Sequence, residues 1–456
     1  MKLVLAVSCL ALAVPSCTDP AQVERQEYAE RVKGAFVKAW DSYMTYAKGL
    51  DGVNPIAEKG HHWYTESLLM TPVDAYSTMC VMGLEKQKAE AKELIFTQLD
   101  FDKDMRIQQF EIAIRMMGGL ISAYQLDGDP RFLTLAQDLA DRMLPVFDSP
   151  TGMPYKFVNL RTGEVSGEMM NPCEIGSMLL EYGMLSELTG NPVYYEKCKA
   201  GVKALYGLRN KETDLVGCGI NVETGEWTDP TSHISGGIDA YYEYLLKGWL
   251  LFKDEELKEM WEVHKAAIDK YIRDDRYGST WYGKADMNTG ERINTTFCAL
   301  DCFYGGCLCL DGDLEIAESL QKSIYKMWTL HGIEPEFLDY STMEVLNPGY
   351  YARPEAIEAT YYNWVFTGKD EYYQQGKTMF ESIEKYCQVE NGYCQLLDVR
   401  SKEYYDTLES FFFAETMMYC YLFFAPEEAF DFYGCVLSTE AHPFFNEVDL
   451  HRQLGL

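Results

Sequence analysis

The sequence predicts an all-α fold in which helical hairpins repeat around a barrel. Short turns recur along the chain at residues 128, 190, 253, 312 and 368. The intervals between them are 62, 63, 59 and 56 residues. An amphipathic stretch lies on each side of a turn, as in residues 175–188 and 194–205. A fixed period of this kind indicates stacked supersecondary units, so the repeating unit is a pair of helices.

The turn residues explain why one helix ends and the next begins. A glycine such as Gly128 or Gly190 caps the C-terminus of a helix, and a following Asp, Asn or Pro starts another. Further turns after Gly83 and Phe424 bring the total to about seven helix pairs. An open solenoid is one arrangement of such pairs. However, the chain ends lack polar capping repeats, which favours closure into an (α/α) barrel.

Longer polar segments separate successive helix pairs. They comprise residues 150–168, 220–237, 281–295 and 334–354. Each falls about half a repeat from the short turns, and therefore at the opposite end of the ring. Long loops on one face of a rigid scaffold usually build the binding site, so we expect the site at this end.

Composition favours one large domain over residues 25–456, because no linker or low-complexity tract divides this part of the chain. The net charge of −31 argues against nucleic acid and anionic membrane surfaces as partners. The chain also has 33 Tyr, 22 Phe and 8 Trp, whose flat faces suit sugar rings, although most are expected to form core.

Residues 1–17 are predicted to be an export signal. Met1-Lys2 precedes an apolar run, residues 3–14, that is too short to cross a bilayer. Cys17 follows a segment that resembles a bacterial lipobox, so we expect lipidation at Cys17 or cleavage nearby. No other segment is long and apolar enough to span a membrane. We therefore expect an exported monomer, either in the bacterial periplasm or lipid-anchored to the cell envelope.

Most of the other cysteines are predicted to be small buried hydrophobic residues, because they lie in apolar helical segments without zinc-ribbon spacing. Cys387 and Cys394 flank a turn and could form a disulfide, which an exported protein permits.

A polar hexamer, residues 438–443, stands between apolar flanks near the end of the chain. Buried polar groups are costly unless something binds them, so the hexamer indicates a ligand or ion site. Taken alone, Glu440 and His442 would suggest a transition-metal site.

Several acidic residues occur in otherwise apolar segments. Glu111 and Arg115 share one helix face, and Asp239, Glu355 and Glu358 begin predicted helices. Glu415 follows three phenylalanines. Each could be a paired structural carboxylate, but together they indicate a site lined with acids. Glycoside hydrolysis requires such a lining, with one carboxylic acid protonating the leaving oxygen and one carboxylate activating water.

The sequence resembles glycoside hydrolase family 47, the class I α-1,2-mannosidases, over nearly the whole chain after the signal. The resemblance rests on the segments at residues 74–84, 110–120, 149–155, 174–177, 239–247, 353–358, 410–416 and 439–443. It implies an (α/α)7 barrel that removes terminal α-1,2-linked mannose with inversion.

The resemblance also implies roles for individual residues. Glu111 would be the general acid, acting through a water, Glu355 the general base and Asp239 a third essential carboxylate. Phe411 would stack under the mannose. Other side chains would hold hydroxyls, waters or the catalytic carboxylates: Arg115, Glu174, Arg353, Glu358, Glu415 and Glu440.

By the same resemblance, the hydroxyl and backbone carbonyl of Thr439 would bind Ca²⁺, with waters and two sugar hydroxyls completing the shell. Calcium takes six to eight oxygen ligands, so this shell is chemically reasonable. His442 then becomes a structural hydrogen-bonding residue.

The sequence departs from the common family pattern at several positions. Ser77 stands where many members have aspartate, and Asp301 lies in a segment that is His-Leu-Val-Cys-Phe in many eukaryotic members. The family disulfide from Cys302 lacks its partner. Gly237 stands where glycan-trimming members can have arginine. These features favour a branch resembling the ER-degradation-enhancing mannosidase-like proteins, in a bacterial, exported form.

Two alternatives remain at this stage. A non-catalytic, lectin-like protein on the same scaffold would bind mannose glycans, but it would not need Glu111, Asp239 and Glu355 together. A barrel glycosidase for another sugar is disfavoured by a calcium site suited to the cis diol of mannose.

Overall fold

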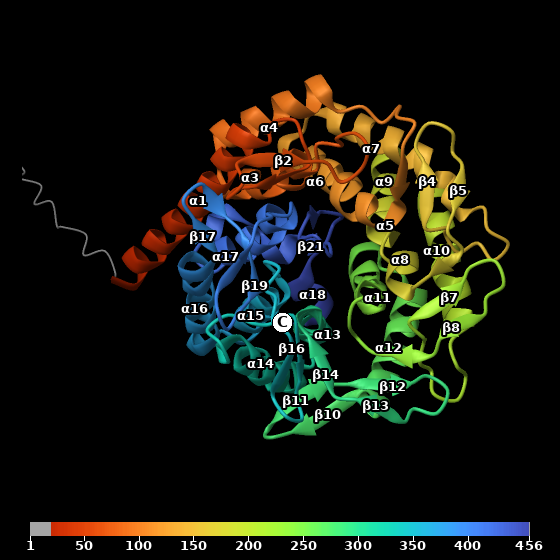
Figure 1. Cartoon of the computed structure of the whole chain (residues 1–456). Coiled ribbons are helices and arrows are strands. Elements are labelled where there is room, and N and C mark those ends of the chain that lie inside the picture. Colours follow the sequence, from red (N-terminus) through yellow and green to blue (C-terminus); the bar gives the residue numbers. More distant parts are fainter. Residues whose placement is uncertain (1–19, 456) are drawn as a thin grey trace, which may run out of the picture.

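The computed structural model describes residues 20–455, which form a closed ring of helices in two layers (Figure 1). The helices of the inner layer are α3 (Tyr76–Met82), α6 (Gly118–Asp127), α9 (Leu179–Thr189), α11 (Asp239–Phe252), α13 (Tyr304–Asp311), α15 (Glu355–Thr367) and α17 (Met417–Leu422). Each packs against the next, and α17 packs against α3. The ring therefore closes, and the prediction of a barrel rather than an open solenoid is confirmed.

The outer layer contains one helix for each inner helix. These are α1 (Pro20–Tyr46), α4 (Glu85–Gln98), α7 (Pro130–Met143), α10 (Val193–Gly207), α12 (Glu255–Tyr271), α14 (Leu314–Thr329) and α16 (Asp370–Cys387). Helix α1 completes this layer, since Trp40 donates to Glu90 of α4 (2.9 Å) and Tyr28 hydrogen-bonds Glu381 of α16. The described chain is thus an all-α, (α/α)7 barrel.

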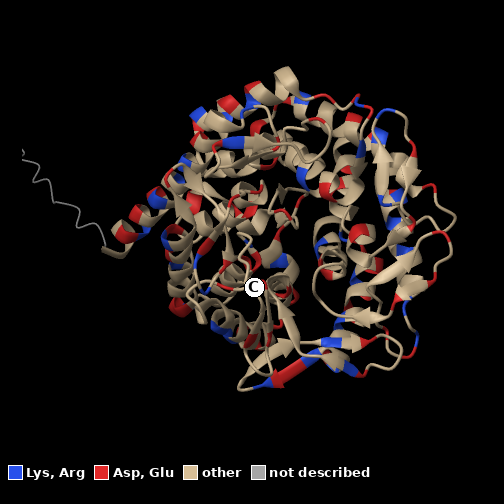
Figure 2. Cartoon of the chain, viewed as in Figure 1, with Lys and Arg blue, Asp and Glu red and all other residues tan. Residues whose placement is uncertain are grey.

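The two layers differ in burial because they meet different surroundings. Inner helices such as α11 and α13 are buried on nearly every side. Outer helices such as α14 bury one apolar face and expose a charged one. Acidic residues occur all around the outside of the ring, and others lie on segments near its centre (Figure 2).

The predicted turns join each inner helix to its outer partner. Gly128, Gly190, Gly312 and Gly368 all have positive φ, between 65° and 84°, and cap inner helices in the left-handed conformation. Lys253 adopts the same conformation at φ 56° despite its side chain. The sequence spacing therefore located these helix ends correctly.

The long loops at the other end contain short antiparallel strands, which the sequence analysis did not predict. Four sheets have three strands: β3 (Arg106–Gln108), β4 (Phe157–Asn159) and β5 (Val165–Ser166); β6 (Met169–Met170), β7 (Gly219–Asn221) and β8 (Trp227–Asp229); β9 (Thr231–Ser232), β12 (Lys284–Asp286) and β13 (Arg292–Asn294); β14 (Thr296–Cys298), β15 (Phe337–Asp339) and β16 (Glu344–Asn347). In each, the first strand comes from one loop and the other two from the next loop along the chain. The sheets therefore tie consecutive loops into a belt.

Smaller elements complete the ring. Two-stranded hairpins are β1 (Gly52–Asn54) with β2 (Lys59–His61), β10 (Arg273–Arg276) with β11 (Ser279–Tyr282), β17 (Gln388–Val389) with β18 (Gly392–Tyr393), and β19 (Gln395–Asp398) with β20 (Glu403–Tyr405). The short helical segments are α2 (Met70–Asp74), α5 (Gln109–Ile112), η1 (Ala113–Met117), η2 (Leu144–Phe147), α8 (Pro172–Gly176), η3 (Ala299–Phe303), η4 (Phe412–Thr416), η5 (Glu427–Ala429), η6 (Phe432–Gly434) and α18 (Leu450–Leu454).

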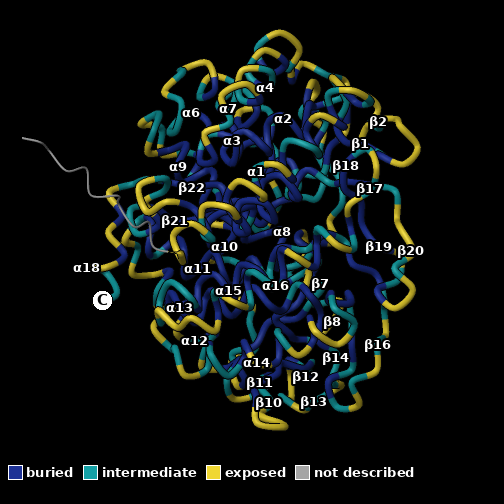
Figure 3. The backbone as a smooth tube through the Cα atoms, turned by 90° about the vertical axis from the view of Figure 1, so that its left-hand side faces the viewer, coloured by how far each residue is buried: buried dark blue, intermediate teal, exposed yellow. Residues whose placement is uncertain are grey.

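A hairpin of β21 (Val436–Leu437) and β22 (Pro443–Phe444) enters the barrel from the short-turn end. Its strands pack against α6 and α11. Gln125, near the end of α6, donates to the Phe445 carbonyl (2.7 Å), which fixes the base of the hairpin at that end. Figure 3 shows this hairpin on the side of the barrel opposite to β16, β19 and β20. The tip, residues 438–442, therefore points toward the loop end.

The described cysteines are free thiols. Ten are buried and two, Cys80 and Cys218, are half-buried, as expected for small apolar residues. Cys387 and Cys394 do not form the disulfide that was considered. The predicted signal, residues 1–17, lies outside the described residues. Within residues 20–455, no helix is long and apolar enough to cross a membrane.

Candidate active site

The predicted carboxylates gather at the starts of the inner helices, at the end of the barrel that carries the sheets. Asp239 and Glu355 are the first residues of α11 and α15. Glu111 and Glu174 lie in α5 and α8, and Glu415 lies in η4 just before α17. Each of these helices thus begins with an acidic side chain in or just before its first turn.

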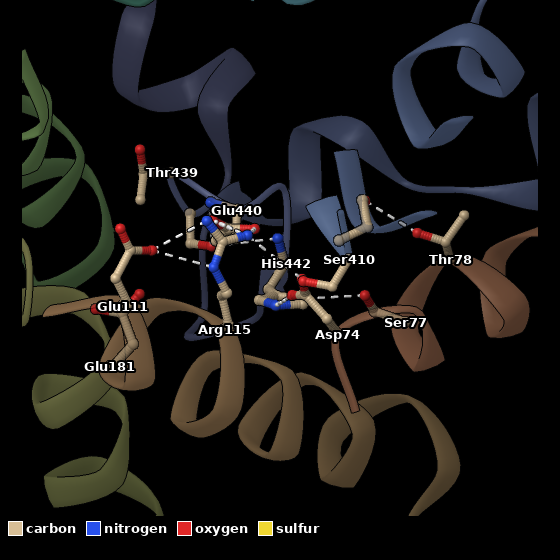
Figure 4. Close-up of polar contacts among 12 residues, drawn as sticks. Asp74, Ser77, Thr78, Glu111, Arg115, Glu181, Ser410, Thr439, Glu440 and His442 are labelled. Atoms are coloured by element: carbon tan, nitrogen blue, oxygen red, sulfur yellow. Dashed lines mark hydrogen bonds and ion pairs between the residues drawn. The ribbon is translucent and has the colours of Figure 1, made fainter. Parts of the chain in front are cut away.

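Arg115 is the centre of one group of side chains, which we call the hairpin cluster: Asp74, Glu111, Arg115, Glu440 and His442 (Figure 4). Its guanidinium donates to Glu111 Oε2 through Nε (3.2 Å) and Nη2 (3.0 Å). Nη1 lies 3.0 Å from Glu440 Oε1 and 3.7 Å from Asp74 Oδ2. Burial lowers the pKa of Arg115, but these carboxylates raise it above its ordinary value. Arg115 therefore stays charged and holds the hairpin tip to the inner helices.

Asp74 and His442 are hydrogen-bonded to each other although they lie 368 positions apart in the sequence. His442 Nε2 donates to Asp74 Oδ1 (3.1 Å), and its Nδ1 lies 3.0 Å from Ser77 Oγ. Ser410 donates a further bond to Asp74. Both ring nitrogens are thus engaged, while Glu440 binds Arg115. The transition-metal hypothesis for Glu440 and His442 is therefore wrong, and the structural role for His442 agrees with these contacts.

Two π-helical turns place functional side chains on either side of the hairpin tip. One is η1, which contains Arg115, and the other is η4, which contains Glu415. Such turns occur often at functional sites, because the extra residue changes the direction of side chains along the helix. Burial and the charge of Glu440 raise the pKa of Glu415. Burial and the charges of Asp74 and Glu111 raise the pKa of Glu440, which hydrogen-bonds Glu415. The pair is therefore arranged to share a proton or to face a cation.

A second group, the Glu355 cluster, contains Asp239, Asp301, Glu334 and Glu355. Burial raises the pKa of Glu355 to about 8 and that of Asp239 to about 6, although the charge of Arg353 opposes both shifts. Glu355 Oε2 is buried without a hydrogen-bond partner. These two carboxyls consequently change protonation near neutral pH, as groups that transfer protons must.

Glu334 and Asp301 add two acids that the sequence analysis did not select. Glu334 is fully buried and neither of its carboxyl oxygens has a partner, so burial and the nearby Glu355 raise its pKa well above the ordinary value. Asp301 accepts from the Cys298 amide (3.0 Å) through Oδ2, while Oδ1 has no partner. Burial raises the pKa of Asp301 to about 7.

Arg353 supplies positive charge to the Glu355 cluster and is held rigidly. Its Nη2 and Nε donate to the two carboxyl oxygens of Glu336, at 2.8 and 3.2 Å. This bidentate geometry fixes the guanidinium plane. Phe411 lies between Arg353 and Arg115, whose guanidinium carbons are 5.9 and 5.4 Å from its ring centre. The aromatic face and the two cations thus form one surface.

The remaining predicted residues also reach this region. Glu358 accepts from Tyr419 (3.1 Å) and lies 3.8 Å from Lys247, and burial raises its pKa to about 7. Glu174 accepts from Gln108 (2.6 Å) and pairs with Lys156 (3.1 Å), nearer the edge of the site.

Thr439 stands half-exposed at the hairpin tip (Figure 4). Its amide donates to Tyr244 Oη (3.3 Å), and Tyr244 donates to the buried Glu181 (2.7 Å). Within residues 20–455, no group of three or more His, Cys, Asp or Glu side chains is arranged to hold a metal ion. Thr439 nevertheless offers a hydroxyl and a carbonyl oxygen, and the carboxylates of Glu440 and Glu415 lie in the same part of the site. These oxygen ligands fit a hard divalent cation that is held largely by water.

Several residues of the site were not selected from the sequence: Asp74, Glu181, Asp301, Glu334 and Glu336. Asp74 was only part of a matching segment, and its link to His442 depends on the hairpin entering the barrel. Glu334 and Glu336 flank a proline in a segment predicted as a polar loop. The apolar residues on both sides of this Glu-Pro-Glu segment were the signal that could have indicated that the two glutamates are buried.

The sequence matches the profile of Glycosyl hydrolase family 47 over residues 35–446. The chain belongs to this family. Family 47 membership makes it a glycoside hydrolase by descent, and the acid-lined site at the loop end of the barrel agrees with that chemistry.

Named relatives and a solved structure extend over most of this family 47 chain. ER degradation-enhancing alpha-mannosidase-like protein 2 from Homo sapiens is 35% identical over 94% of the chain and 78% of the relative. Alpha-mannosidase I MNS5 from Arabidopsis thaliana is 32% identical over 99% of the chain and 83% of the relative. The structure of alpha-1,2-mannosidase from Trichoderma reesei aligns with a TM-score of 0.85 at 27% identity, covering 92% of this chain and 99% of that one.

Proposed function

We propose that this protein is a calcium-dependent exo-α-1,2-mannosidase that hydrolyses terminal α-1,2-linked mannose from oligosaccharides or glycans with inversion of configuration. The main support is the presence of the Glu355 cluster and Glu111 at the same end of the barrel, because together they combine carboxyls of raised pKa with a partly exposed carboxylate on a rigid ring. Similarity to a solved α-1,2-mannosidase supports the choice of sugar and linkage.

In this proposal, the general acid comes from the hairpin cluster and the general base from the Glu355 cluster. Glu111, protonated at that step, would donate its proton through a water to the leaving oxygen, and Arg115 would hold the carboxylate that remains. Glu355 would accept a proton from the attacking water, with Asp239 as the third carboxylate near the charge of Arg353. Inversion requires the acid and the base to act from opposite faces of the sugar with a water between. Phe411 would support the apolar face of the mannose ring.

Thr439 is the proposed calcium ligand, through its hydroxyl and its backbone carbonyl. When bound, the ion would hold two vicinal sugar hydroxyls and add positive charge that favours ionised carboxylates. Glu440, which follows Thr439 in the tip, and Glu415, which hydrogen-bonds Glu440, would then be stabilised in the charged form.

The biological setting is also a proposal. The predicted signal with Cys17 favours a bacterial protein that is exported to the periplasm or lipid-anchored, and that acts as a monomer through a single domain, residues 25–456. Gly237 and Ser77 favour the branch that resembles the ER-degradation-enhancing proteins. In this setting, the enzyme would release mannose from external glycans.

Hydrolysis of mannobioses tests the proposed activity. Calcium-loaded protein should cleave α-1,2-mannobiose much faster than the α-1,3 and α-1,6 isomers, and EDTA should abolish the activity until calcium is restored. No cleavage of any isomer by calcium-loaded protein, together with retained binding of α-1,2-mannobiose, would instead support a lectin-like protein. Activity unaffected by thorough chelation would contradict the calcium role.

A further inference from the structure

A line of aromatic rings and one guanidinium leads from the site to the outer edge of the sheets. Arg353 lies between Phe411 and Tyr351, with its guanidinium carbon 5.9 Å from the first ring centre and 6.0 Å from the second. The rings of Tyr351 and Tyr405 then meet edge to face, with centres 6.3 Å apart. Phe411 is buried, Tyr351 is half-buried and Tyr405 is 47% exposed, so the line runs from inside to outside.

The backbone around Tyr351 holds its ring in this position. A Cβ on Gly349 would lie 2.5 Å from Tyr351 Cζ, so the ring packs directly on the glycine backbone. Ala352 has a left-handed φ of 60°, and its carbonyl accepts from Thr416 (2.6 Å). A strained residue that persists because its surroundings fix it is a feature of functional sites. Tyr351 is thus a pre-positioned side chain rather than a mobile one.

Tyr405 lies on β20, where neighbouring side chains point to opposite faces. Tyr405 meets Tyr351, whereas Tyr404 points the other way and donates to the Gln388 carbonyl (3.5 Å). Their exposed fractions are nearly equal, 47% and 45%. Figure 3 places β19, β20 and β16 together at the loop end. The chain therefore contains two similar tyrosines, of which one faces the line of rings and one does not.

We propose that Tyr351 and Tyr405 form a carbohydrate-binding platform for mannose units beyond the scissile bond, so that the protein prefers chains of three or more sugars. This proposal rests on the proposed function, since it extends the same site. An uncharged sugar suits the platform because its ring presents C–H groups to an aromatic face and adds no charge to an acidic protein. The platform is continuous with Phe411 through Arg353, which is the path a linear chain would follow.

Binding and turnover across chain lengths test the platform. Affinities for α-1,2-linked mannobiose, mannotriose and mannotetraose are measured with the Glu355→Gln protein, with and without Tyr405→Ala, in calcium. We expect Tyr405→Ala to weaken binding of mannotriose or mannotetraose by about three- to tenfold, the size of one aromatic contact, while mannobiose changes less than twofold. Tyr404→Ala is the matched control and should change none of them. Gly349→Ala, which displaces the Tyr351 ring, should act like Tyr405→Ala.

The outcomes separate this proposal from the proposed function. If the protein without the Glu355 change hydrolyses nothing, but the length-dependent loss of binding is seen, the platform stands and the enzyme proposal fails. If hydrolysis occurs but Tyr405→Ala and Tyr404→Ala bind all three sugars like the parent, the platform is overturned. An equal loss at every length would also overturn it, because Tyr405 would then act on the cleaved sugar. Absence of binding to any of the sugars would overturn both.

Discussion

The hairpin cluster and the Glu355 cluster are built from the same kind of side chain but hold it in different states. In the hairpin cluster, Asp74 accepts from His442 and Ser410, and Arg115 neutralises Glu111 and Glu440. In the Glu355 cluster, buried carboxyl oxygens of Glu334, Asp301 and Glu355 have no partner.

This difference indicates that the two groups of carboxyls have different roles. Buried charges with complete partners fix a structure, since removing one partner leaves the other uncompensated. Buried carboxyls without partners take up protons more readily instead, because burial raises their pKa values, and this suits them to proton transfer. We therefore expect the hairpin cluster mainly to hold the hairpin, with Glu111 as its one reacting member, and the Glu355 cluster to supply the other carboxyls of the proposed reaction.

Glu355→Gln tests the reactive side. We expect kcat to fall by about 10²- to 10⁴-fold, because an amide cannot accept the proton, while affinity for mannobiose changes little. The unfolding free energy should not fall, because the amide replaces a buried acid whose pKa is raised to about 8. Glu371→Gln, in the first turn of α16 but exposed, is the matched control and should retain full activity. Equal activity of the two variants would remove Glu355 from the reaction.

Asp74→Ala tests the structural side. Removing this carboxylate takes away the acceptor of His442 and Ser410 and one of the three carboxylates that face the buried Arg115, so we expect a loss of about 3–5 kcal/mol in unfolding free energy, measured with urea. Ser77→Ala removes only a neutral hydrogen bond and should cost about 1 kcal/mol. If Asp74→Ala kept its stability but lost activity, the division between the clusters would be wrong.

Asp301→Asn tests the origin of the raised pKa values. The pKa of Asp301 is raised to about 7 by burial, so the folded state holds its proton more tightly than the unfolded state. Its contribution to stability is therefore present at low pH and is lost as pH rises from about 4 to 7. The asparagine can keep the bond from the Cys298 amide. Relative to the natural protein, the variant should gain on the order of 3 kcal/mol between pH 4.5 and 7.5. A constant difference across this range would contradict the assignment.

Calcium binding tests the proposed role of Thr439 at the hairpin tip. At a hundredfold excess over Kd, calcium should raise the unfolding free energy by about 2.7 kcal/mol, which a thermal or urea titration can measure. Thr439→Ala should reduce this gain, because only the backbone carbonyl remains as a protein ligand. Magnesium should stabilise less, since it requires a smaller and more regular oxygen shell. Equal stabilisation of Thr439→Ala and the natural protein would place the ion elsewhere.

Local sequence signals predicted the ring well, because a helix end depends on a few adjacent residues. Gly128, Gly190 and Gly312 mark inner helix ends where they were expected. The belt of sheets was missed because strands such as β5 and β6 have only two residues and no alternating pattern.

The sequence predicted only those site residues whose type is unusual for their surroundings, such as an acid in an apolar segment. The predicted carboxylates do lie together, at the starts of the inner helices. The partners of Asp74 could not be foreseen, because His442 and Ser410 are each more than 300 positions away. The role of Glu334 could not be predicted either. Whether a buried carboxyl has hydrogen-bond partners depends on the whole surrounding structure, and Glu334 has none.

Proton NMR of the first product tests the central claim most directly. Natural, calcium-loaded protein is mixed with α-1,2-mannobiose, and the anomeric signals are followed before mutarotation equilibrates them. An acid at Glu111 and a base at Glu355 acting from opposite faces predict that β-mannose forms first and then converts to the α anomer. If α-mannose formed first, one carboxylate would have attacked the sugar directly, and the proposed roles of Glu111 and Glu355 would be contradicted.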